Sequence, residues 1–301
     1  LRKMPAYGIE LYFSYDPEYP LDYFWPDKGV HRDHRKILLT DGVTAYMGGR
    51  NIQDKYFINW RDCDIRVTGP ASGDLARVFN QNLDRVAPGR EPVHVKSDSV
   101  LLAAAARDSV AGLSQHYGKT IQIIHESPRD RKLPLRNCFQ WAIEHSRKYF
   151  WFYNPYTPPS PSILKALEDA AARGVDVRWI APSKNDVFVE KWMGESLYRE
   201  LLKAGVRIYE WREGILHAKQ FICDDYLTII GSSNLDNLGF FLEYEVEAVI
   251  YDEDVTREGA RTYLSDLENE CDEITLETVR RWSIFRKVRN WLVRAFGSPV
   301  G

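Results

Sequence analysis

Short hydrophobic runs and longer amphipathic stretches alternate along the second half of the chain. The runs at 149–155, 175–182 and 206–211 are rich in aromatic and β-branched residues, which favours strands. Between them, residues 160–174 and 197–205 place apolar side chains at helical spacing, which predicts amphipathic helices. Strands that alternate with helices are typical of an α/β fold, in which the helices cover a sheet.

The chain divides into a first half, a second half and a basic tail, at residues 1–118, 119–277 and 278–301. The first half ends in connecting helices, because residues 71–118 carry mainly helical periodicity. Residues 1–15 align by eye with 198–211, and this alignment places Gly8 against Gly205. We therefore expect the first half to lack the opening strand and helix of the second, and the chain to be a fragment.

The composition narrows the possible classes of function. The 301 residues are 44% hydrophobic and 28% charged, as in a globular protein, and the net charge of -3 argues against a dedicated nucleic-acid binder. The four cysteines lie far apart, which indicates neither a zinc knuckle nor a disulfide framework. No apolar run approaches the roughly 20 residues that a membrane-spanning helix needs.

One pattern of polar residues occurs twice. In each copy a His-x-Lys pair is followed by an aspartate, a glycine and an asparagine, and an acidic residue comes after the asparagine. The copies are His34, Lys36, Asp41, Gly48, Asn51 and Asp62 in the first half, and His217, Lys219, Asp224, Gly231, Asn234 and Glu245 in the second. Because all the internal offsets agree, the pattern indicates a duplication.

The residues after each His-x-Lys pair predict a β-hairpin. Aliphatic runs flank residues 41–42 and 224–225, and we expect a two-residue turn at each position. Asp41 and Asp224 lie at these turns, far along the strand from the histidines, and we interpret them as structural. The motif glycines are assigned to the same structural group: Gly48, Gly49 and Gly231.

The predicted hairpins also place small residues near the histidines. A histidine and a lysine two positions apart share one face of a strand. If the turns have two residues, Gly49 lies opposite His34 and Ser232 lies opposite His217. A small residue at this position leaves room for a ligand, and Ser232 adds a hydroxyl donor.

These motifs resemble the phospholipase D superfamily, whose duplicated His-Lys-Asp motif has this spacing. The stretches "HRDHRKILLTDG", "WRDCDIRVTGP" and "YRELLKAGVRIYEWREGILHAKQFICDD" are similar to bacterial cardiolipin synthases in particular, and the resemblance extends to about residue 275. It implies two repeats related by a pseudo-twofold axis, each a mixed β-sheet flanked by helices. The first repeat would be truncated at its start.

Two converging sets of histidine, lysine and asparagine are suited to a phosphodiester substrate. Lys36 and Lys219 neutralise the phosphate, and the amides of Asn51 and Asn234 donate hydrogen bonds to its oxygens, together with Ser232. The lysines supply the charge that other phosphotransferases take from a metal. Since no carboxylate cluster has metal-ligand spacing in the sequence, we expect no metal and no other cofactor.

The histidines would carry the covalent chemistry. One imidazole attacks phosphorus to form a phosphohistidine, and the other acts as general acid and then as general base. The resemblance implies that His34 is the nucleophile and His217 the acid and base. We expect Asp62 and Glu245 each to hold the far ring nitrogen of the histidine in its own half. The other histidines fall outside the pattern: His31, His94, His116, His125 and His145.

The resemblance implies a phosphatidyltransferase that joins two phosphatidylglycerol molecules into cardiolipin and releases glycerol. A hydrolytic phospholipase D would use the same residues and accept water, so the outcome depends on how well the site excludes water. A nuclease-like phosphodiesterase would need a basic cleft with stacking aromatics, whereas the aromatics here lie mostly in strand-like runs. A membrane-binding scaffold would not need both motifs intact. The expected partners are phosphatidylglycerol and an anionic membrane surface, without nucleic acid, at the cytoplasmic face of a bacterial inner membrane.

The C-terminal tail predicts a basic amphipathic helix. Its apolar stripe comprises Trp282, Phe285, Val288, Leu292, Val293 and Phe296, and the basic residues Arg280, Arg286, Lys287 and Arg294 lie mainly on the other side. This pattern is typical of a helix that lies on anionic lipid. A helix that packs on the domain's own core is the alternative.

Overall fold

The structure is a computed structural model that describes residues 10, 12, 32–106, 115–128, 132–156, 160–236, 240 and 243–296. Several expectations concern residues outside this part of the chain. They are the placement of His31, the alignment of residues 1–15 with 198–211 together with the truncated start that it implies, and the end of the connecting helices at 107–113.

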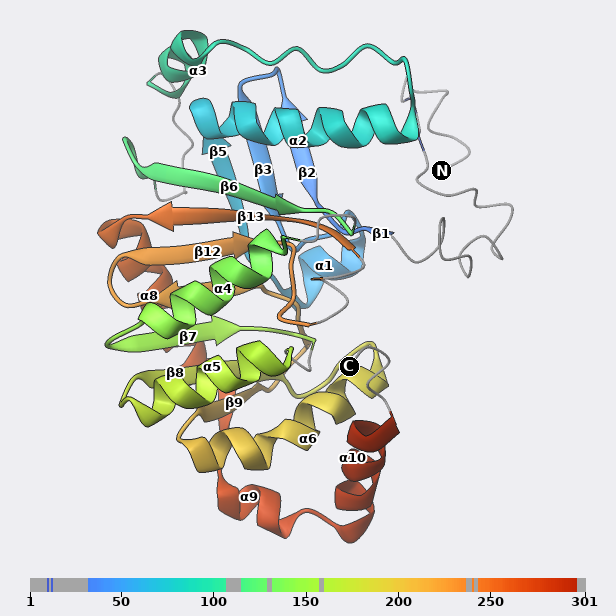
Figure 1. Cartoon of the computed structure of the whole chain (residues 1–301), viewed down its shortest axis with the longest axis vertical. Coiled ribbons are helices and arrows are strands. Elements are labelled where there is room, and N and C mark those ends of the chain that lie inside the picture. The colour runs from blue at the N-terminus through green and yellow to red at the C-terminus, as the bar shows by residue number, and fades with distance from the viewer. Residues whose placement is uncertain are drawn as a thin grey trace.

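A large mixed sheet forms the centre of the molecule (Figure 1). Its strands run in the order β1, β13, β12, β11, β7, β8, β9 and β14, and β6 pairs with β13 as well. Their bounds are β1 (Arg32–Asp33), β6 (Thr120–Glu126), β7 (Tyr149–Tyr153), β8 (Asp176–Pro182), β9 (Arg207–Trp211), β11 (Gln220–Cys223), β12 (Leu227–Gly231), β13 (Glu243–Tyr251) and β14 (Cys271–Ile274). The strands expected at 149–155, 175–182 and 206–211 are confirmed as β7, β8 and β9, which pair in parallel.

Helices cover both faces of this sheet, as the alternation of strands and helices predicts. Helices α4 (Pro134–His145), α5 (Pro161–Ala172) and α6 (Phe188–Ala204) pack on one face, and α8 (Glu253–Glu270) packs on the other. On the first face the rings of Phe139 and Phe221 are 4.5 Å apart, and on the second Tyr263 stacks on Trp151 at 5.6 Å. The expected helices are confirmed, although α6 begins at Phe188, nine residues before position 197.

The described part of the first half forms a smaller sheet that packs against β12 and β13. Its strands are β2 (Ile37–Thr40), β3 (Thr44–Gly48) and β5 (Asp64–Thr68), and the helices after them are α2 (Pro70–Val86) and α3 (Asp98–Ala105). Met47 and Leu75 from this half share a buried cluster with Val246 of β13. The three strands pair antiparallel, so the described residues of the first half do not form the mixed sheet that we expected.

The two motif hairpins turn through three residues rather than two. Thr40 pairs with Thr44, and Cys223 pairs with Leu227, which leaves 41–43 and 224–226 as the turns. The extra residue shifts the register by one position, so the prediction that Gly49 and Ser232 lie opposite the histidines is wrong. Each turn begins with an aspartate in the left-handed region, a conformation that aspartate and asparagine tolerate better than most residues.

The two turn aspartates differ in what they contact. The carboxylate of Asp224 is buried and accepts hydrogen bonds from the backbone N–H groups of Arg147, Lys148 and Tyr149, the last two at 2.8 and 3.0 Å. Asp224 therefore ties the hairpin to the start of β7. Asp41 is exposed at its own turn.

The basic tail forms α9 (Leu276–Arg281) and α10 (Ile284–Phe296), and α10 packs along α6. Arg286 and Arg289 of α10 form ion pairs with the buried Glu195 of α6, and Arg294 pairs with Glu200. The helix thus turns part of its basic side toward the protein. Among the residues that the structure describes, no helix has both the length and the apolar character to cross a bilayer.

Candidate active site

The two motif histidines are held by carboxylates of the opposite halves. Nδ1 of His34 is 2.8 Å from Oε1 of Glu245, and Nδ1 of His217 is 2.8 Å from Oδ2 of Asp62. The expectation that each carboxylate holds the histidine of its own half is therefore wrong. When Nδ1 donates its proton to the carboxylate, the tautomer is set and Nε2 is left as the reactive atom.

Two short parallel strand pairs cause this exchange. Strand β1 runs beside the start of β13, and the N–H of His34 donates to the carbonyl of Tyr244 at 3.0 Å. Strand β10 (Ile215–Leu216) runs beside β4 (Trp60–Arg61), and the N–H of His217 donates to the carbonyl of Arg61 at 2.8 Å. The residue after each of these carbonyls is the paired carboxylate. Each histidine is thus fixed against the strand that the other half contributes.

The two motif lysines lie close to their histidines. Nζ of Lys36 donates to the carbonyl of His34 at 2.5 Å, and Nζ of Lys219 donates to the carbonyl of His217 at 2.7 Å. Burial lowers the pKa of Lys36 to about 8, and the charge of the nearby Lys219 also lowers it. Burial also lowers the pKa of Lys219. Each of the two buried lysine charges disfavours the other, so a bound anion would stabilise both.

The asparagines and Ser232 take different places around this centre. Nδ2 of Asn51 donates to the hydroxyl of Tyr56 at 2.7 Å. Asn234 is buried, and its Oδ1 has no hydrogen-bond partner among the described residues. The hydroxyl of Ser232 donates to Glu245 and accepts from the N–H of Val246 at 3.1 Å. Ser232 therefore positions Glu245, which differs from the phosphate donor that we expected.

The motif glycines allow neighbouring segments of the chain to approach the backbone closely. A Cβ at Gly49 would collide with the carboxylate of Asp62, and one at Gly231 would collide with the carbonyl oxygen of Val246. A Cβ at Gly48 would likewise collide with the carbonyl of Cys63. These three positions exclude larger residues because of close packing, which agrees with a structural role.

Three aromatic rings surround His217, and the sequence had not identified these rings as part of the site. The ring centroids of Tyr56, Trp60 and Tyr156 lie 5.2, 5.3 and 5.9 Å from that of the imidazole, and His217 is only 2% exposed. Burial, followed by the charges of the two lysines, lowers the pKa of His217 far below its ordinary value. The imidazole is therefore neutral in the free protein. Trp60 lies two residues before Asp62 in sequence. This strand-like spacing was the signal in the sequence that could have placed Trp60 beside His217.

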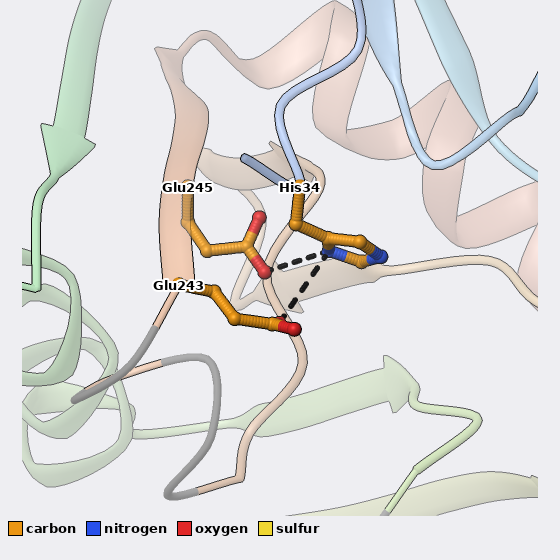
Figure 2. A group of neighbouring side chains, drawn as sticks. All are labelled: His34, Glu243 and Glu245. Carbon is orange, nitrogen blue, oxygen red and sulfur yellow. Dashed lines mark hydrogen bonds and ion pairs between the residues drawn. The ribbon is translucent and has the colours of Figure 1, made fainter. Parts of the chain in front are cut away.

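His34 lies in a more open and more acidic environment (Figure 2). Its side chain is 24% exposed, and Oε2 of Glu243 is 3.9 Å from Nδ1, next to the bond with Glu245. Burial alone would raise the pKa of Glu245, but His34, Lys36 and the hydroxyl of Ser232 together lower it. Glu245 thus remains ionised beside the imidazole.

His34, Glu243 and Glu245 also form a group whose ligand atoms lie within 4.8 Å of one another, as a cation site would require. The sequence-based statement that no such cluster occurs overlooked the strand alternation that brings the two glutamates onto one face. Both oxygens of Glu245 accept hydrogen bonds, from His34 and from Ser232. Nδ1 of His34 is the donor in the first of these hydrogen bonds. A metal ion would need free lone pairs on the same atoms, and the hydrogen bonds already use them.

A further glutamate lies on the same face of β13 beneath the lysines. Glu247 is fully buried, and its Oε1 accepts the N–H of Ser233 at 2.7 Å. Burial raises the pKa of Glu247 well above its ordinary value, and the charge of Glu245 raises it as well.

The described histidines outside the motifs have other contacts. Nε2 of His116 is 2.7 Å from Glu258, and Nδ1 of His145 is 2.9 Å from the carbonyl of Trp141. His125 belongs to β6 and pairs with Val246, while His94 is exposed. None of these contacts includes a catalytic group named above.

The second half matches a family model described as "Cardiolipin synthase, PLD-like domain" over residues 140–267. Cardiolipin synthase 2 of Bacillus anthracis is 32% identical over 287 residues, which are 93% of this chain and 53% of that protein. A cardiolipin synthase of Geobacillus sp. is 32% identical over 256 residues, 83% of this chain and 49% of its own length. The chain thus spans about half the length of the curated relatives it matches.

The fold is also found in a solved structure. The phosphatidylserine synthase of Haemophilus influenzae superposes with a TM-score of 0.63 at 14% identity, over 88% of this chain and 68% of that one. At this identity the likeness concerns the fold alone. With the duplicated motif, the exchanged histidine–carboxylate pairs and the matched domain, the chain belongs to the phospholipase D superfamily and is similar to the bacterial cardiolipin synthases.

Proposed function

We propose that this chain is a phosphatidyltransferase that makes cardiolipin from two molecules of phosphatidylglycerol and releases glycerol. The observation that supports it best is the exchanged pairing, in which both histidines have a carboxylate on Nδ1 and a lysine beside them. Two such sets supply a nucleophile, an acid and a phosphate site with two positive charges. A two-step phosphoryl transfer requires these groups.

In the first proposed step, Nε2 of His34 attacks phosphorus and the bond from phosphorus to the glycerol headgroup breaks. The leaving glycerol oxygen takes a proton from His217, and a phosphatidyl group remains on His34. In the second step His217 removes the proton from a hydroxyl of the next phosphatidylglycerol, whose oxygen attacks phosphorus and displaces His34. Atoms and protons balance, because His217 regains in the second step the proton that it gave to the glycerol oxygen in the first.

The charges around the site are suited to these roles. Glu245 and Glu243 face the ring of His34, where positive charge develops when Nε2 bonds to phosphorus. His217 is neutral in the free protein because burial and the two lysines disfavour its protonation. A bound phosphodiester adds a negative charge among these groups and raises the proton affinity of His217, so substrate binding prepares the general acid.

The aromatic cover favours transfer over hydrolysis. Tyr56, Trp60 and Tyr156 pack around His217 and leave the imidazole almost unexposed. Water that is kept away from the general base cannot be activated, so a glycerol hydroxyl delivered by a lipid has the advantage. This is the feature that separates the proposed transferase from a hydrolase with the same histidines.

We further propose that the reaction takes place at an anionic membrane surface, at the cytoplasmic face of a bacterial inner membrane, and needs no metal ion. Both proposed substrates are membrane lipids, and the relatives are bacterial cardiolipin synthases. Lys36 and Lys219 supply the charge that a divalent ion would supply elsewhere. EDTA is expected to leave the turnover of a soluble short-chain substrate unchanged, and a lasting requirement for a divalent ion would contradict this point.

The decisive experiment incubates the chain with radiolabelled phosphatidylglycerol in liposomes and separates the products. Cardiolipin and free glycerol in equal amounts are the expected result, and the double variant His34→Ala, His217→Ala is the control. Phosphatidic acid without cardiolipin would show a hydrolase. Cleavage of single-stranded DNA without lipid turnover would overturn the proposal.

A further inference from the structure

Helix α1 (Asp54–Ile58) exposes large apolar side chains next to the aromatic cover of the site. Phe57 and Ile58 are 66% and 79% exposed, and Ile52 in the preceding loop is 90% exposed. Tyr56 of the same helix is buried against the ring of His217. The helix therefore has one side on the catalytic imidazole and presents apolar side chains to solvent at the rim of the site.

The start of α6 repeats this arrangement from the other half. The hydroxyl of Tyr156 donates to Asp186 at 2.7 Å, and the ring of Tyr156 contacts His217. The three residues after Asp186 are exposed and apolar, with Phe188 72% exposed. They comprise Val187, Phe188 and Val189. The rings of Tyr56 and Tyr156 both contact the imidazole of His217, so the two apolar groups lie on neighbouring parts of the rim.

Helix α10 extends the apolar surface beyond the rim. Glu195 of α6 holds two of its arginines, and this attachment leaves Phe285, Val288 and Trp291 exposed on the outer side. Phe285 and Val288 line an apolar hollow of about 480 Å³ along the helix. In Figure 1, α1, the start of α6 and α10 lie along the same side of the molecule. The expected helix with an apolar stripe is thus present, although Trp282 packs inward against Tyr198.

The charge of this segment indicates what covers the apolar surface. Residues 276–296 contain six arginines and lysines and a single carboxylate, Glu277. Arg280 and Arg281 are each 78% exposed in their side chains and share the single carboxylate of Glu277, so this exposed group keeps a net positive charge. Apolar side chains flanked by cations fit an anionic bilayer, where the cations reach the headgroups and the apolar groups enter the acyl boundary.

We propose that the rim residues and the outer side of α10 form one docking face for an anionic phospholipid bilayer. The rim comprises Ile52, Phe57, Ile58, Val187, Phe188 and Val189, and it would enter the bilayer around the mouth of the site. A lipid headgroup then reaches the lysines without its acyl chains crossing water. The identity of the lipid rests on the proposed function, whereas the docking itself is measured without turnover.

The test compares vesicle binding by flotation, with vesicles of phosphatidylglycerol and phosphatidylcholine. The rim variant is Phe57→Ser, Ile58→Ser, Phe188→Ser, and we expect it to bind more than about tenfold more weakly, because three large apolar groups lose their burial. The α10 variant Phe285→Ser, Trp291→Ser should lose severalfold. The matched control is Leu102→Ser, since Leu102 of α3 is 57% exposed at the far end of the molecule and its removal should change nothing.

Turnover separates docking from chemistry. The rim variant should lose activity on vesicles and keep it on short-chain phosphatidylglycerol below its micelle concentration. Unchanged vesicle binding by the rim variant, or an equal loss in the Leu102 control, would overturn the docking face. A wild-type dimer that the rim substitutions dissociate would show an interface between copies and would also overturn it. Strong vesicle binding by a wild-type chain without lipid turnover would support docking and refute the proposed function.

Discussion

The two halves of the site give their histidines different surroundings. His34 is partly exposed and faces Glu245 and Glu243. His217 is buried beneath three rings and faces one carboxylate, that of Asp62. Two residues before the paired carboxylate, the strand carries Glu243 beside His34 but Trp60 beside His217. One duplicated motif therefore supports two environments, because the paired carboxylate and the residue two positions before it come from the opposite half.

The proposed roles of the two histidines, nucleophile and acid-base, therefore depend on residues outside the motifs. An imidazole that becomes positively charged by bonding to phosphorus benefits from nearby carboxylates. An imidazole that must exchange protons with an alcohol and not with water benefits from a dry cover. The proposed roles follow that comparison, and substitutions in matched positions of the two halves can break or sharpen it.

The largest expected effects come from the histidines. His34→Ala and His217→Ala should each lower turnover by about a thousandfold or more, since each removes a group that bonds to the substrate or moves its proton. Mass spectrometry of His217→Ala after brief exposure to substrate should find a phosphatidyl group on His34. The same adduct on His217 in the His34→Ala variant would reverse the roles.

The paired carboxylates should come next, and they test the exchange. Asp62→Asn and Glu245→Gln should each lower turnover by about a hundredfold to ten-thousandfold, because an amide no longer holds the reactive tautomer. Imidazole nitrogen NMR should show the tautomer of His217 altered by Asp62→Asn, with His34 unchanged. If Asp62→Asn altered His34 instead, the pairing between halves would be incorrect.

The turn aspartates offer a comparison in stability. Asp224→Asn should lower the free energy of unfolding by about 1–3 kcal/mol, because a buried carboxylate that accepts several backbone N–H groups is lost. Asp41→Asn keeps the left-handed turn at an exposed position and should change it by less than about 0.5 kcal/mol. Urea unfolding measures both. Equal losses would show that the two turns are anchored alike.

The pH dependence should reflect Lys36, whose pKa burial lowers to about 8. As the pH rises through about 8, the free protein loses this cation, so kcat/KM should fall on the alkaline side. Lys36→Arg keeps the charge and should move the alkaline limb to higher pH, whatever its effect on the maximum. An alkaline limb that stays in place in this variant would assign it to another group.

The smallest expected effect is that of the second carboxylate beside His34. Glu243→Gln should lower kcat by about threefold to tenfold, which corresponds to roughly 1 kcal/mol from a charge near the surface. Steady-state kinetics with short-chain substrate measures this loss. No change would indicate that Glu243 has no part in the difference between the halves, and a loss as large as that of Glu245→Gln would make the two glutamates equivalent.

The motif hairpins and the α/β alternation could be predicted because they depend on local spacing. Residues two apart lie on one face of any strand, and amphipathic periodicity identifies a helix wherever it packs. The turn length was missed for a local reason: Asp41 and Asp224 adopt the left-handed conformation that makes room for a third residue. The alternation of Glu243 and Glu245 was readable in the same way.

By itself, the sequence determined the two sets of candidate catalytic groups and the local order in which they lie. The tertiary structure decided which carboxylate holds which histidine, because β1 pairs with β13 and β4 with β10. It also decided that Tyr56, Trp60 and Tyr156 meet over one imidazole and not over the other. Offsets along a chain specify neighbours within one strand or helix, whereas partners more than a hundred residues apart depend on how separate strands pair across the molecule.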